Sequence, residues 1–182
     1  NLLSAHRDLA NPEHRAEVAA LWGVDDVPAT PGKTAIERFE AVKRGEIKAL
    51  WVACTNPAQS LPNQALVHEA LQKAECVVLQ EAFADTETAR FADVLLPAST
   101  WGETEGTVTN SERCIARVDA GVPPPGEARA DWAIVCDFAR RLLPEKGARL
   151  FPYADAEAVF NEHRESTRGR DLDITGLSYA LL

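Results

Sequence analysis

Three short apolar runs alternate with helical patterns, and this alternation constrains the fold most. The runs are Ala49–Cys54, Cys76–Leu79 and Val94–Leu96. Each run is apolar throughout, as is typical of strands that are buried on both faces of a parallel sheet. A helix capped by Asn63 is expected between the first two runs, and a shorter one capped by Asp85 between the last two. The sequence therefore predicts an α/β fold with an open, mostly parallel sheet and helices on both faces.

A polar segment follows each apolar run. The three segments are residues 55–63, 80–85 and 97–111. Because the carboxyl ends of parallel strands meet at one edge of a sheet, these segments are expected to lie together, where open α/β folds bind their ligands. The third segment is polar, contains glycines and lacks a hydrophobic period, so it is expected to be a loop. A ligand site is therefore predicted at this edge.

Two helices are predicted ahead of the first apolar run. Asn11 and Pro12 supply an N-cap and a first helical residue, and Gly23 ends this helix. Thr34 and Glu37 have the spacing of a capping box, which begins the second helix.

The C-terminal third is expected to be helical in part. The apolar spacing predicts helices over residues 131–143 and 155–164, joined by a linker. We expect an α/β domain over residues 1–145, followed by a linker and a C-terminal helical extension over residues 146–182. No internal repeat stands out.

Charge and composition exclude some classes of function. The 182 residues carry 19 basic and 28 acidic side chains, a net charge of −9, which argues against a nucleic-acid binder. The sequence has no apolar run of 18 residues, so neither a membrane-spanning helix nor a membrane partner is expected. It does not start with a signal-peptide pattern. It contains no methionine, which favours a domain excised from a longer protein, with processing as the alternative.

Metal ligands and catalytic residues are not predicted. The four cysteines form no CxxC pair, so neither a zinc site nor an iron–sulfur cluster is indicated, and we expect buried free thiols. His68 is followed four residues later by Gln72 rather than by a second histidine, so the zinc-protease pattern fails. Glu103 and Glu105 could act as an acid and a base, but in so polar a loop they are expected to be solvated.

A series of short motifs runs from residue 6 to residue 143. They include LWGV at 21–24, TNP at 55–57, ADVLLPA at 92–98, WGETEGT at 101–107, TNSER at 109–113 and PGEAR at 125–129. In this order and spacing they resemble the oxidoreductases that carry bis-molybdopterin guanine dinucleotide, and nitrate reductases of the assimilatory type in particular. The resemblance implies a Rossmann-like domain that binds one guanine dinucleotide arm of the molybdenum cofactor.

Five residues are implied as cofactor ligands by their positions in these motifs: Asn56, Gln80, Glu81, Thr104 and Asp131. Asp131 would accept hydrogen bonds from guanine as a bidentate carboxylate, and Gln80 and Glu81 would meet the ribose or guanosine region. Many family members have lysine in place of Thr104 and aspartate in place of Glu81. Two simpler roles stay open, because Asn56 before a proline can form a turn and Asp131 can cap its helix.

The resemblance also implies a parent enzyme, which would reduce nitrate to nitrite by two-electron oxo transfer at molybdenum. Its metal ligands and iron–sulfur cluster would lie outside this chain, so the isolated fragment is expected to be inactive. Its partners would be the remaining domains and an electron-donor protein or domain. The expected location is the cytoplasm, with the periplasm as the alternative. Alternative functions are the equivalent domain of another molybdopterin oxidoreductase, such as a formate dehydrogenase, or a stand-alone nucleotide-binding or interaction module.

Overall fold

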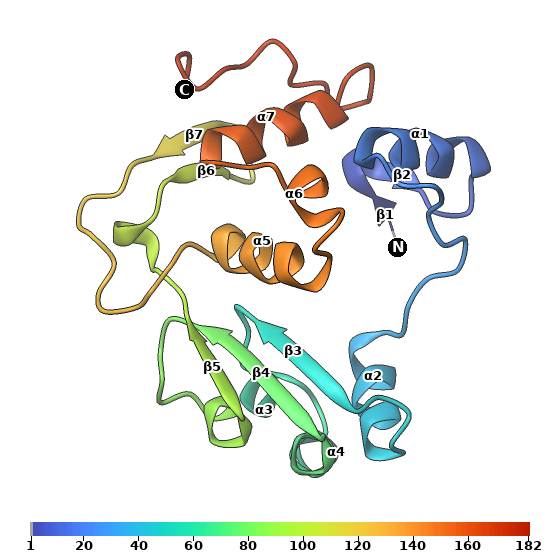
Figure 1. The fold of residues 1–182 in the computed structure, drawn as a ribbon, viewed down its shortest axis with the longest axis vertical. Helices are drawn as coiled ribbons and strands as arrows, with labels where there is room; N and C mark the ends of the chain where they lie inside the picture. Colours follow the sequence, from blue (N-terminus) through green and yellow to red (C-terminus); the bar gives the residue numbers. More distant parts are fainter. Residues whose placement is uncertain (1) are drawn as a thin grey trace. The chain divides into compact units, whose positions relative to one another are not determined.

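The computed structural model describes residues 2–182, which divide into two compact units. We call one of them the sheet unit, and it comprises Gly32–Thr100 and Pro123–Ile134. The other, the hairpin unit, comprises Asn1–Pro31, Trp101–Val122 and Val135–Leu182. Each unit is thus assembled from stretches that are far apart in the sequence (Figure 1).

The sheet unit contains a parallel sheet of three strands in the order β3 (Ala49–Ala53), β4 (Cys76–Glu81) and β5 (Val94–Pro97). Figure 1 draws β4 between the other two strands. The helices are α2 (Ala35–Lys43), the short α3 (Pro57–Ser60), α4 (Gln64–Lys73) and the 3-10 helix η2 (Thr88–Phe91). The predicted α/β class with an open parallel sheet is therefore confirmed.

The core of this unit lies on one face of the sheet. Alternate strand residues share a face, which places the side chains of Leu50, Val52, Val77 and Leu79 together. They pack with apolar side chains of the helices, namely Phe39, Val42, Ala58, Val67, Ala70 and Leu71. Gln80 has the opposite orientation, and its side chain bonds to Asp131 in the first turn of α5 (Asp131–Leu142).

Strand β5 departs from the expectation that all three runs are buried. Val94 is 43% exposed and Leu95 is 40% exposed, whereas Val77 and Leu79 of β4 are fully buried. The reason is topological, since β4 is the central strand and β5 is an edge strand. An apolar run by itself does not show which strand lies at an edge.

The expected helix starts are largely confirmed. Asn11 caps α1 (Pro12–Trp22), which ends at Gly23 with a left-handed φ of 64° that glycine adopts readily. Thr34 and Glu37 form both bonds of the capping box of α2. The cap at Asp85 was wrong, because η2 begins at Thr88 and Glu87 is the residue before it.

The hairpin unit includes two antiparallel strand pairs. They are β1 (Leu2–Leu3) with β2 (Arg7–Asp8), and β6 (Gly106–Thr109) with β7 (Ile115–Val118). Short 3-10 helices cover Ser4–His6 (η1) and Trp101–Glu103 (η3), and α6 (Gly147–Leu150) and α7 (Ala156–Ser166) complete the unit. Residues 97–111 are thus not one loop, since η3 and the whole of β6 lie within them.

A buried arginine joins the two ends of the chain inside the hairpin unit. Arg7 is 8% exposed and donates to the carbonyl oxygen of Ser166 at 2.7 Å and to the carboxylate of Glu17 at 2.8 Å. Tyr179 near the C-terminus is also buried, against Phe160. Within residues 2–182 no helix has the length and apolar character needed to cross a membrane.

Replacing Leu79 by alanine is expected to lower the free energy of unfolding of the sheet unit by about 2–5 kcal/mol, because it leaves a cavity in the fully buried core. Urea unfolding followed by circular dichroism measures the change. Leu95→Ala on the exposed edge strand is the matched control and should cost clearly less. Equal costs for the two substitutions would contradict the assigned sheet order.

Candidate functional site

Four of the five predicted ligand residues belong to the sheet unit and stand at or beyond the carboxyl ends of its strands. Asn56 follows β3, Gln80 and Glu81 end β4, and Asp131 opens α5. Thr104 belongs to the hairpin unit, between η3 and β6. We call the four residues of the sheet unit, together with Cys54, the strand-end cluster.

The tightest contacts in the strand-end cluster meet at the Asp131 carboxylate. Its Oδ1 accepts hydrogen bonds from Gln80 Nε2 at 2.6 Å and from Cys54 Sγ at 3.3 Å. Gln80 Nε2 also lies 3.4 Å from the main-chain oxygen of Asp131. The main chains of the two donors are joined as well, since Cys54 N donates to Gln80 O at 3.1 Å.

Two acceptor atoms of this network are left over. Gln80 is only 1% exposed, yet its Oε1 is buried without a hydrogen-bond partner among residues 2–182. Asp131 is partly exposed, and its Oδ2 likewise has no hydrogen-bond partner in the described part of the chain. Buried polar atoms in proteins are nearly always paired, so the unpaired Gln80 Oε1 is unusual. Only Oδ2 of the partly exposed Asp131 is left as an acceptor for a ligand.

Asn56 has a structural role in its turn. Its Oδ1 accepts from both the main-chain N–H and the hydroxyl of Thr88, at 3.0 and 2.6 Å, and its Nδ2 donates to Gln59 Oε1 at 2.9 Å. Thr88 is fully buried, and its hydroxyl oxygen in turn accepts from Ala58 N at 3.1 Å. The turn role that the sequence left open is therefore present. A ligand contact of Asn56 stays a prediction.

Glu81 bends back on its own loop. Its Oε1 accepts from the main-chain N–H of Ala82 at 2.8 Å, and the side chain is partly exposed. Beyond it lies a shallow pocket of about 400 Å³, lined by Asn56, Gln59, Phe83, Asp85, Thr86 and Glu87. The described residues that line it include no lysine or arginine, and Phe83 presents an aromatic ring that is 61% exposed. This pocket and the strand-end cluster offer mainly acceptors, which suits hydroxyl and N–H groups better than phosphates.

Cys54 is the member of the cluster that the sequence interpretation missed. The pKa of its thiol is raised to about 11, first by partial burial and then by the hydrogen bond to Asp131 and the negative charges of Asp131 and Glu81. The thiol therefore keeps its proton at neutral pH and can act as a donor. Its place directly after an apolar run was visible in the sequence, but its partner Asp131 is 77 positions away.

The expectation of buried cysteines was correct only for Cys136. Cys54 and Cys114 are exposed, Cys76 is partly buried, and all four are free thiols. Among residues 2–182 no group of three or more potential ligands could hold a metal ion.

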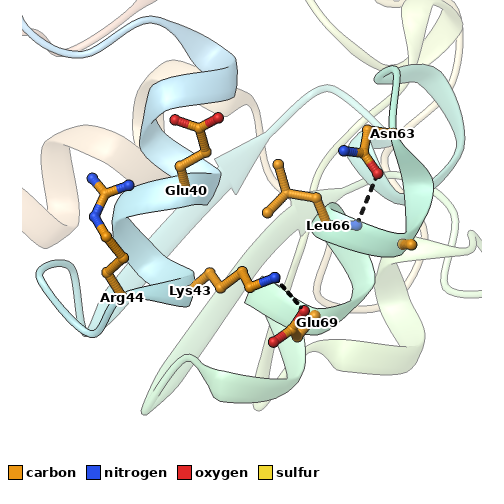
Figure 2. A pocket seen from close by; sticks show the side chains of 7 residues that line it. Glu40, Lys43, Arg44, Asn63, Leu66 and Glu69 are labelled. Atoms are coloured by element: carbon orange, nitrogen blue, oxygen red, sulfur yellow. Dashed lines mark hydrogen bonds and ion pairs between the residues drawn. The ribbon is translucent and has the colours of Figure 1, made fainter.

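A larger pocket of about 520 Å³ lies between α2 and α4, away from these contacts (Figure 2). Lys43 reaches from α2 toward Glu69 of α4, with an N–O distance of 2.7 Å, and Asn63 accepts from Leu66 N as the cap of α4. Its polar groups thus serve the packing of the two helices, and we assign it no chemistry.

Replacing Asp131 by asparagine should lower the pKa of the Cys54 thiol, because it removes a negative charge and leaves burial unchanged. At pH 8.5 the rate of Cys54 alkylation by iodoacetamide is therefore expected to rise several-fold, since the thiolate is the reactive form. Mass spectrometry of digests measures the rate at each cysteine. Alkylation of Cys114 serves as the internal control, and an unchanged rate at Cys54 would contradict the contact.

Comparisons with known proteins identify the family of this sequence. A family model described as Molybdopterin oxidoreductase matches residues 4–141. An assimilatory nitrate reductase catalytic subunit of Bacillus subtilis is 45% identical over 182 residues, which is 99% of this chain and 25% of that protein. A nitrate reductase of Klebsiella oxytoca is 43% identical, over 97% of this chain and 21% of that protein. The chain thus spans about a quarter of the length of these relatives.

The fold also matches a solved structure. Acetylene hydratase from Pelobacter acetylenicus superposes with a TM-score of 0.64 over 91% of this chain and 22% of that one. The sequence identity is 22%, so the likeness concerns the fold alone.

Proposed function

Because the chain belongs to the molybdopterin oxidoreductase family, we propose that it is the domain of a nitrate reductase that binds one guanine dinucleotide arm of a bis-molybdopterin guanine dinucleotide cofactor. The observation that carries the proposal is the strand-end cluster, in which Asp131 Oδ2 remains available as an acceptor. It stands where open α/β sheets bind nucleotides.

The chemistry of the donor set fits a guanine nucleoside. Guanine presents N1–H and an N2 amino group side by side, and the free Oδ2 of Asp131 can accept charge-assisted hydrogen bonds from both through its two lone pairs. Glu81 is a strand-end carboxylate of the kind that binds ribose hydroxyls in dinucleotide folds. Asn56 Nδ2 donates one of its two hydrogens to Gln59 Oε1, so one amide hydrogen is left for a ligand. In this proposal Thr104 offers a hydroxyl to the pyrophosphate, where lysine is usual.

The proposed parent enzyme reduces nitrate to nitrite. When bound, the cofactor supplies two-electron oxo transfer at molybdenum. We propose that the metal ligands and an iron–sulfur cluster are outside this chain, so the isolated chain is inactive and needs the remaining domains and an electron donor. The proposed location is the cytoplasm, as for assimilatory enzymes, with the periplasm as the alternative. The boundary near residue 145 also remains a proposal.

GMP is expected to bind the purified chain more tightly than AMP, because adenine offers an acceptor where guanine N1 offers a donor. Asp131→Ala should weaken GMP binding about tenfold or more, as expected for a lost charge-assisted pair. Calorimetry or amide NMR shifts measure the affinities. Glu75→Ala, which removes an exposed acid at the other end of β4, is the control for net charge. GMP binding that is insensitive to Asp131→Ala would contradict the proposed site.

A further inference from the structure

We propose that Gln80 and Cys54 are positioning residues that fix the Asp131 carboxylate, so that its free oxygen Oδ2 selects guanine. The inference rests on the proposed function and extends it to residues that act through Asp131. It assigns to Cys54 a role that the sequence did not predict.

Two donors converge on one oxygen of Asp131. Both donors bond to Oδ1, at 2.6 Å from Gln80 Nε2 and 3.3 Å from Cys54 Sγ, and no donor of the described residues bonds to Oδ2. A carboxylate held through one oxygen cannot rotate freely, so the direction of the other is defined. Two adjacent donors of a base can then be met without reordering the side chain, which is how preorganised sites bind tightly.

The bond to Asp131 determines the orientation of the Gln80 amide. An ionised carboxylate only accepts, so the amide must direct its NH₂ group toward Asp131 and its oxygen away. The oxygen is therefore forced into a buried place without a partner among residues 2–182. Burying an unpaired amide oxygen is unfavourable, so the bond to Asp131 holds the amide in this orientation at a cost to stability.

The backbone at Cys54 has an uncommon conformation. Its φ of 57° lies in the left-handed region, where a residue other than glycine is uncommon. Its N–H still donates to Gln80 O at 3.1 Å, so the strained residue stays tied to the strand that carries Gln80. Such strain persists where the surroundings fix the conformation, and it is concentrated at functional sites. The raised thiol pKa keeps the proton that the bond to Asp131 requires.

The test compares GMP with IMP, which lacks only the N2 amino group of guanine. In the purified full chain, the ratio of the two dissociation constants reports whether the carboxylate reads both donors. We expect Gln80→Leu to reduce the preference for GMP about fivefold or more, and Cys54→Ala to reduce it about two- to threefold, in line with one lost hydrogen bond each. Cys54→Ser keeps a donor and should restore the preference.

Two controls separate positioning from folding. Cys76→Ala removes a thiol at the opposite end of β4 and should leave the ratio unchanged. Thermal unfolding of each variant shows whether it is folded, and if Gln80→Leu does not fold, the Cys54→Ala and Cys54→Ser pair decides the question. A merely structural role of Cys54 would weaken both nucleotides equally and leave the ratio intact, which would overturn the inference.

The same measurements distinguish failure of the positioning role from failure of the proposed guanine site. If Asp131→Ala abolishes the preference for GMP while the Gln80 and Cys54 variants keep it, the positioning role is wrong and the guanine site stands. If the folded wild-type chain does not bind GMP, or if Asp131→Ala keeps the preference, the proposed site is wrong and the positioning role falls with it.

Discussion

The parallel pairing of β3 with β4 is the constraint on which the strand-end cluster depends. The register pairs Ala53 with Gln80, and the next hydrogen bond, from Cys54 N to Gln80 O, carries the pairing one residue beyond β3. Because both strands end at this point, a thiol and an amide from different parts of the sequence face the same carboxylate. A shift of register by one residue would turn Gln80 into the apolar core, where no partner exists for its amide.

The strand-end cluster offers mainly hydrogen-bond acceptors, so it suits some parts of a dinucleotide better than others. The base and the sugar carry hydrogen-bond donors, and the carboxylates of Asp131 and Glu81 can accept from them. Pyrophosphate needs cations or N–H groups, and the pocket beside Asn56 lacks lysine and arginine among its described lining residues. In the proposed enzyme the recognition of guanosine would therefore be assigned to this chain, while much of the phosphate charge would be neutralised by other segments.

The sequence alone predicted the elements whose causes are local. Apolar runs indicated the strands, and the caps at Asn11, Thr34 and Asn63 indicated helix starts, since cap and helix are neighbours in the chain. Contacts across long separations were not predictable, such as the bond between Asn56 and Thr88, 32 positions apart. The β6–β7 hairpin was missed because the residues of β6 are small or polar. They alternate between half-buried and exposed, so the strand has no fully buried apolar side chain.

The bond from Arg7 to Ser166 O also bears on the order in which the chain acquires structure during synthesis. The two residues are 159 positions apart, so the buried guanidinium has no such partner until residue 166 has been made. The three strands of the sheet unit are complete by Pro97, and they can pair long before that. Domains that emerge from the ribosome fold as their residues become available. The sheet is therefore expected to form before Arg7 can bond to Ser166.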